Sequence, residues 1–111
     1  MSAPAVVVVL VTAPDVDAGK RIAQALVEPG LAACVNVVPG LTSIYRWKRT
    51  VEEASEVLLL VKTTRERVDA CRAALATVHP YEVPEFVVLD ADQVAPAYAA
   101  WVADETRGPA Q

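Results

Sequence analysis

Residues 41–61, LTSIYRWKRTVEEASEVLLLV, predict the most distinctive element of the chain, a long β-hairpin. Side chains alternate in character before the tip, which indicates strand structure. One face of this first arm carries a hydroxyl and two aromatic rings, those of Ser43, Tyr45 and Trp47. The tip is expected at Lys48-Arg49-Thr50, and Val57–Val61 lies in the returning arm. The two arms are longer than one small sheet requires, which favours contact with another subunit.

The segment before the hairpin predicts two strands with a helix between them. Residues 6–12 and 31–38 are continuous apolar runs, as is typical of strands covered on both faces. Between these runs, Asp15 or Asp17 can cap a helix, and Pro29-Gly30 ends it.

The segment after the hairpin predicts a second helix, a fourth strand and a closing helix. Thr63–Glu66 fits a capping box that opens a helix ending at His79-Pro80. Residues 83–89 are expected to form a strand, with Pro84 near its start. The closing helix is expected to bury one stripe of residues, namely Val94, Ala97, Tyr98, Trp101 and Val102.

This order of elements predicts an α/β (α+β) fold, a ferredoxin-like βαββαβ sandwich with a long central hairpin and an extra C-terminal helix. We interpret residues 1–111 as a single domain, with its core at about residues 5–105. Helices of such a chain cover one face of the sheet only. Because residues 6–11 and 57–61 are apolar on both faces, further copies of the chain are the simplest cover for the second face.

The composition argues against nucleic-acid and membrane partners. Ten Lys and Arg residues against fourteen Asp and Glu residues give a net charge of −4, without the basic cluster that nucleic-acid binding requires. The apolar run at residues 5–11 is far shorter than the ~20 residues of a membrane span. Cys34 and Cys71 match no zinc or redox spacing. We interpret them as two reduced, buried thiols of a cytoplasmic protein, with a single disulfide between them as the alternative.

Five motifs of this sequence occur in the order and spacing of one family: VTAPD (11–15), LAACVN (31–36), PGLTSIYRW (39–47), EVLLLVKT (56–63) and HPYEVPE (79–85). Over about residues 6–101 the chain therefore resembles the CutA divalent-cation tolerance family. The resemblance implies a homotrimer, in which long hairpins embrace neighbouring subunits, and a role in tolerance to divalent cations, especially copper. The family is also similar in overall build to PII-type signalling proteins.

Two features depart from the family pattern. The family's hairpin usually has a glycine where this chain has Arg49, so we expect a different turn type at the tip. Cys34 aligns with a cysteine that is proposed as a metal ligand in the family. Apolar residues such as Val11 and Ala74 replace the other family cysteines here.

A divalent metal ion, Cu²⁺ in particular, is the cofactor that we expect, and no organic cofactor is expected. The candidate ligands are His79, Cys34, Glu82 and Glu85, since imidazole and thiolate suit copper and carboxylates add oxygen donors. A structural role is the alternative for two of them. Cys34 lies in an apolar strand, where cysteine packs as a small hydrophobic residue, and His79 can close the end of a helix.

A cleft between subunits is expected to contain five further side chains: Lys62, Tyr81, Ser43, Tyr45 and Trp47. The alternative function is a PII-like regulatory or scaffold trimer that binds a small anion or a partner protein in this cleft. A purely structural assembly without a ligand is a third interpretation. We do not expect an enzyme, because the sequence has no glycine-rich phosphate loop and no Cys-x-x-Cys or His-Glu-x-x-His motif.

Overall fold

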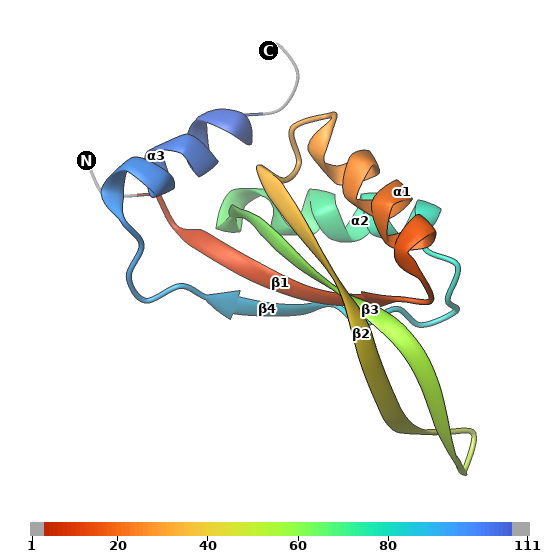
Figure 1. Cartoon of the computed structure of the whole chain (residues 1–111). Coiled ribbons are helices and arrows are strands. Elements are labelled where there is room, and N and C mark those ends of the chain that lie inside the picture. Colours follow the sequence, from red (N-terminus) through yellow and green to blue (C-terminus); the bar gives the residue numbers. More distant parts are fainter. Residues whose placement is uncertain (1–3, 108–111) are drawn as a thin grey trace.

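A computed structural model describes residues 4–107 of the chain. Its main elements are β1 (Val6–Ala13), α1 (Val16–Val27), β2 (Cys34–Trp47), β3 (Thr50–Thr64), α2 (Val68–Val78), β4 (Val87–Asp90) and α3 (Pro96–Glu105) (Figure 1). A 3-10 turn, Arg65–Arg67, connects β3 to α2. Within the described range, no helix has the length and apolar character needed to cross a membrane.

The four strands form one antiparallel sheet in the order β2-β3-β1-β4. The helices α1 and α2 lie together on one face of this sheet (Figure 1). The predicted ferredoxin-like fold is therefore confirmed, together with its long hairpin and its extra C-terminal helix.

The core lies between the sheet and the two helices α1 and α2. Alternate residues of β1 point into it, and Val7, Val9 and Val11 are completely buried. Helix α1 begins where the sequence predicts, because the Asp15 carboxylate accepts a hydrogen bond from the backbone N–H of Ala18 at 2.8 Å.

The opposite face of the sheet is largely uncovered by the chain itself. Cross-strand register places one set of residues on this open face: Val8, Leu10 and Thr12 of β1, Cys34, Asn36 and Val38 of β2, Leu58, Leu60 and Lys62 of β3, and Val87 and Leu89 of β4. Helix α3 covers one end of this face, where Ala99 and Val102 pack with Val6 and Ala33. Val38, Val87 and Leu89 are 41%, 45% and 46% exposed. Beyond the end under α3, the open face is therefore a mainly apolar surface that no other element of the described residues covers.

The β2–β3 hairpin extends well beyond the rest of the fold, and the chain measures 49 × 28 × 22 Å (Figure 1). A register shift between Val38 and Leu41 marks a bulge where the hairpin leaves the sheet. Trp47 pairs with Thr50, so the loop consists of Lys48 and Arg49 alone. Both residues have positive φ, 49° and 71°, as a type I′ turn requires. Arg49 therefore adopts the backbone that favours glycine. The inclusion of Thr50 in the tip is wrong, because Thr50 is already paired with Trp47.

Three local predictions are also wrong. Thr63 is not part of a helix cap, because it is a buried residue of β3 whose hydroxyl donates to the Leu31 carbonyl at 2.7 Å. The fourth strand is limited to Val87–Asp90, since β1 pairs with it only there. Helix α3 buries Ala99 and Val102 and leaves the rings of Tyr98 and Trp101 on its exposed side, because it packs on the edge of the open face rather than on a broad core.

Candidate functional site

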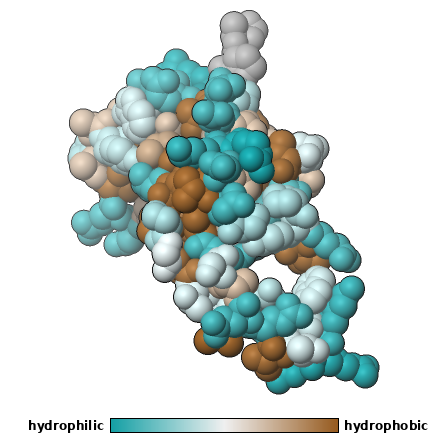
Figure 2. Space-filling view, turned by 45° about the vertical axis from the view of Figure 1, so that its right-hand side comes forward, coloured by the Kyte–Doolittle hydropathy of each residue, from teal (hydrophilic) through white to brown (hydrophobic). Residues whose placement is uncertain are grey.

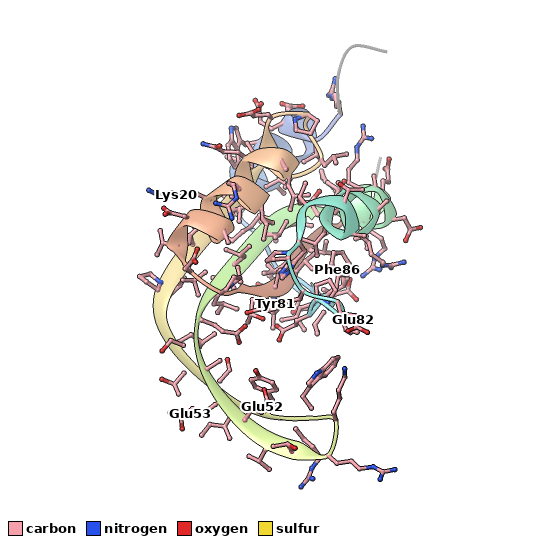
Figure 3. The ribbon with its side chains drawn as sticks, turned by 90° about the vertical axis from the view of Figure 1, so that its right-hand side faces the viewer. Lys20, Glu52, Glu53, Tyr81, Glu82 and Phe86 are labelled. Atoms are coloured by element: carbon pink, nitrogen blue, oxygen red, sulfur yellow. The ribbon has the colours of Figure 1, made fainter. Side chains whose placement is uncertain are left out.

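A groove of about 800 Å³ separates the hairpin from the segment that follows α2. Its walls are formed by Thr12 of β1, by Ser43, Ile44, Tyr45, Trp47, Glu52 and Glu56 of the hairpin, and by Pro80, Tyr81, Glu82, Val83, Pro84 and Glu85. Figure 2 shows the molecule hollowed between hairpin and body. In Figure 3, Glu52 lies on the side of the hairpin nearer to Tyr81 and Glu82, whereas Glu53 lies on the far side.

The groove is continuous with the open face. Residues 52, 54 and 56 of β3 alternate in phase with 58, 60 and 62, so they project from the same side of the strand. Thr12, which pairs with Leu58, lies where the two regions join. An apolar sheet surface therefore leads directly into a groove with acidic walls.

Tyrosine–glutamate pairs tie the walls of the groove together. The Tyr81 hydroxyl donates to the Glu56 carboxylate, which links the segment after α2 to β3. The Tyr45 hydroxyl donates to Glu52 at 3.3 Å, within the hairpin. Burial and the hydrogen bond to Glu56 raise the pKa of Tyr81 far above its ordinary value. Both phenols therefore act as hydrogen-bond donors at neutral pH.

The groove has a strongly acidic character. Four carboxylates, those of Glu52, Glu56, Glu82 and Glu85, line it, and no lysine or arginine among residues 4–107 does. Burial and, to a smaller degree, the nearby Glu56 carboxylate raise the pKa of Glu85. The negative charge of the groove is therefore not compensated by its own walls.

His79 lies next to the groove but is held inside the fold. Its side chain is 9% exposed, Nε2 is 2.7 Å from the carbonyl oxygen of Thr12, and Nδ1 accepts from the Tyr81 N–H at 3.1 Å. Its backbone N–H donates to the Leu75 carbonyl and ends α2. Because both ring nitrogens have partners, this conformation supports the structural role of His79 at the helix end and leaves no nitrogen free for a metal ion.

Cys34 and Lys62 lie elsewhere, on the open face. They are directly opposite each other on β2 and β3, and the Lys62 ammonium donates to the side-chain oxygen of Asn36. Cys34 is half-buried and carries a free thiol, whereas the free thiol of Cys71 is fully buried. Burial raises the pKa of Cys71 to about 11, so this thiol is a core group.

The structure therefore brings together only part of the residues singled out in the sequence. Tyr81, Ser43, Tyr45 and Trp47 line one groove with Glu82 and Glu85, whereas Lys62 and Cys34 do not. Among residues 4–107 no three His, Cys, Asp or Glu side chains are close enough to hold a metal ion. The four candidate ligands do not converge within one chain.

Sequence reasoning missed the two carboxylates that the hairpin contributes to the groove, those of Glu52 and Glu56. Glu52 pairs with Tyr45 across the hairpin, and Glu56 shares its face. A two-residue loop fixes the pairing of the two hairpin strands, so that Tyr45 faces Glu52. Recognising that loop in the sequence would therefore have placed both glutamates on the groove side of the hairpin.

Comparisons with known proteins agree on one family. Residues 7–105 match the family described as "CutA1 divalent ion tolerance protein". The divalent-cation tolerance protein CutA of Thermus thermophilus is 48% identical over 99 residues, which are 89% of this chain and 96% of that protein. Mouse protein CutA is 49% identical over 92 residues, which are 83% of this chain but only 52% of the mouse protein.

Two solved structures are similar to this chain over more than nine tenths of its length. The Thermus thermophilus Cut A1 structure has a TM-score of 0.89 at 48% identity and covers 91% of this chain and 98% of its own. The structure of CutA1 from Oryza sativa has a TM-score of 0.91 at 38% identity. The match covers 95% of this chain and 96% of the rice chain. The relatives differ in the location their names give, since an Arabidopsis thaliana protein is called chloroplastic and an Archaeoglobus fulgidus protein periplasmic.

Proposed function

Because this chain belongs to the CutA1 divalent ion tolerance family, we propose that it is a homotrimeric binding protein that holds a divalent cation, copper(II) in particular, where its subunits meet. The observation that carries the proposal is the open face. It exposes a continuous apolar surface that ends in an acidic groove.

The open face supports the assembly on energetic grounds. A large contiguous apolar patch on the surface of a protein usually marks a site where another molecule binds. The hairpin adds to it, since Ile44 and Val51 are 69% and 62% exposed. Figure 2 shows hydrophobic side chains on the surface of the body and of the hairpin. A two-stranded ribbon of this kind is marginally stable in water without a partner. Further copies of the chain supply the partner.

The donors within one chain fit a metal ion only in part. Glu82 and Glu85 present carboxylates to the groove, and Cys34 presents a thiol to the open face. The ring of His79 is engaged by Thr12 and Tyr81. We therefore propose that a bound cation takes donors from more than one subunit, with Cys34, Glu82 and Glu85 as ligands and with His79 as a structural residue. Copper, when bound, would be held by these groups rather than used in a reaction, and an enzymatic role is not proposed.

The groove does not favour the alternative of an anion-binding, PII-like trimer. An anion would meet four carboxylates there, and Lys62 is engaged with Asn36 outside the groove. We place the protein in the cytoplasm on the basis of its two free thiols.

Two measurements test the proposal. Sedimentation velocity of the wild-type protein should give the mass of a trimer at micromolar concentration, and a stable monomer would contradict it. Calorimetric titration with Cu²⁺ should then show affinity reduced by about tenfold or more in Cys34→Ser and in the pair Glu82→Gln, Glu85→Gln. Glu105→Gln on α3 serves as the control. Unchanged affinity in a variant that combines all three substitutions would remove these residues from the role.

A further inference from the structure

We propose that the groove between the hairpin and the segment after α2 binds a linear aliphatic polyamine. The ammonium groups of this ligand would lie at the glutamates of the groove and its methylene groups on the aromatic rings. The inference goes beyond the proposed metal binding, because the ligand belongs to a different chemical class and the residues that hold it belong to a single chain. The three rings that line the groove are those of Tyr45, Trp47 and Tyr81.

The carboxylates are spread along the groove rather than gathered at one point. Glu52 and Glu56 lie on the same side of β3, four positions apart. At a rise of about 3.3 Å per residue, their backbones are roughly 13 Å apart along the strand. Oxygen ligands of a single metal ion each lie about 2.0–2.6 Å from it, and no three acidic, His or Cys side chains of residues 4–107 are placed to do so. A ligand that meets both glutamates must therefore carry its charges along an extended chain.

An aromatic ring accompanies each of these two carboxylates. The hydroxyl of Tyr45 donates to Glu52, and the hydroxyl of Tyr81 donates to Glu56. These hydrogen bonds hold the two glutamates at different places in the groove. Ring faces attract ammonium groups and pack against the methylene groups beside them. The alternation of carboxylates and rings therefore matches a chain in which ammonium groups alternate with short methylene segments.

The protein already contains one contact between a groove ring and an alkylammonium group. The ammonium of Lys48 lies 5.7 Å from the centroid of the Trp47 ring. At such a distance the negative face of an indole attracts a cation. This contact is independent of the glutamates, and it identifies a primary amine on a methylene chain as a group that this ring binds. A polyamine presents the same group at both of its ends.

The size and charge of the groove fit a ligand with several positive charges. Its volume of about 800 Å³ lies within the range of small-molecule sites. Among residues 4–107, no lysine or arginine lines it beside the four glutamates. A ligand with one ammonium group would leave three of these carboxylates without a counter-charge, whereas a triamine or tetraamine neutralises most or all of them. The groove is therefore expected to favour longer amines over shorter ones.

Calorimetric titration with spermidine, a triamine, tests the inference. We expect spermidine to bind about tenfold or more tightly than 1,4-diaminobutane, choline or Mg²⁺. The double variant Glu52→Gln, Glu56→Gln removes two charges but keeps an oxygen acceptor for each tyrosine hydroxyl, and it should weaken spermidine binding about tenfold or more. Trp47→Leu removes a ring and should weaken it about fivefold.

Matched control variants separate this site from a general attraction of cations to an acidic protein. Glu53→Gln with Glu66→Gln also removes two charges, but neither residue lines the groove, and Figure 3 shows Glu53 on the far side of the hairpin. Trp101→Leu on α3 removes a ring that is 42% exposed, close to the 38% of Trp47. Both controls should keep the wild-type affinity. Circular dichroism and sedimentation velocity verify that all variants retain the fold and the assembly of the wild type.

The outcomes distinguish this inference from the proposed function. Spermidine that binds no more tightly than Mg²⁺, or that loses as much affinity in the controls as in the groove variants, would overturn the inference. A separate titration of the wild type with Cu²⁺, in the absence of amine, tests the metal. Copper binding without spermidine binding would leave the proposed function standing, whereas spermidine binding without copper binding would refute the metal site alone.

Discussion

Nε2 of His79 lies 2.7 Å from the carbonyl oxygen of Thr12, a residue 67 positions earlier in the chain. This hydrogen bond connects the end of α2 to the end of β1. The other ring nitrogen accepts from the Tyr81 N–H and orients the segment that forms one wall of the groove. The only histidine of the sequence therefore serves as a brace between two elements.

His79→Ala should lower the stability of the fold. The substitution leaves the Thr12 carbonyl and the Tyr81 N–H without their side-chain partner in a partly buried position, at a cost of about 1–3 kcal/mol. Thermal unfolding at matched protein concentration measures the loss, with the exposed Thr77→Ala as control. If His79 were instead mainly a metal ligand, the variant would lose copper affinity while the unfolding temperature of the metal-free protein stayed the same.

Arg49→Gly should stabilise the protein. Arg49 has a φ of 71°, and an L-residue with a side chain pays roughly 1–2 kcal/mol for this conformation. Glycine avoids that penalty but loses more conformational entropy on folding. We therefore expect the free energy of unfolding to rise by about 0.5–1 kcal/mol per chain. The control is Arg46→Gly, in the strand next to the turn, which should lower the stability of the protein. A lower urea midpoint for Arg49→Gly would mean that contacts of the arginine outweigh its backbone strain.

Gly19→Ala should destabilise α1 despite the higher helix propensity of alanine. A Cβ atom at this position would lie 3.1 Å from Val57 Cγ2 and 3.2 Å from both Leu59 Cδ2 and Val37 Cγ1. Three side chains of two strands would have to move together, which costs about 1–3 kcal/mol. Chemical denaturation measures the effect, and the exposed Lys20→Ala in the same helix provides the control. A gain in stability would show that the helix–sheet contact is looser than the structure indicates.

Glu85→Gln should stabilise the fold at neutral pH and not in acid. Burial and the Glu56 carboxylate raise the pKa of Glu85, so the folded state binds the Glu85 proton more tightly than the unfolded state does. The favourable contribution of the protonated group is complete at low pH and is lost as the pH rises through the folded-state pKa. Glutamine remains neutral and keeps that contribution.

The gain from Glu85→Gln should be small, since Glu85 is largely exposed. Urea unfolding at about pH 7 and about pH 4 measures it, with Glu105→Gln as control. A gain of the same size at both pH values would mean that it does not come from the charge of Glu85.

Much of the fold was predictable because its signals are local. The valine-rich run of β1, the Asp15 cap and the Pro29-Gly30 stop are each determined by a few neighbouring residues, and the structure places α1 where they indicate. Thr63 shows the limit of such signals. Its hydroxyl suits a helix cap, but the Leu31 carbonyl lies 2.7 Å away across the fold, so Thr63 remains in the strand. The hydrogen bond to Leu31, a contact between distant parts of the chain, therefore decided whether Thr63 belongs to the strand or to a helix cap.

The groove was predictable only in part for the same reason. Tyr45 and Trp47 were recognisable as one face of a strand, because alternation is a property of the sequence. The hydrogen bond from Tyr81 to Glu56 joins residues 25 positions apart. It depends on how the segment after α2 is placed relative to the hairpin, which the local sequence does not determine.

The sequence by itself determined the family, the order of the elements and the presence of an over-long hairpin, since these depend on periodicity, turn residues and motif spacing along the chain. The tertiary structure decided which side of the sheet stays open, that His79 is bonded inside the fold, and that four glutamates face one groove. These properties depend on the cross-strand register and on the packing of distant segments, which short-range patterns do not fix.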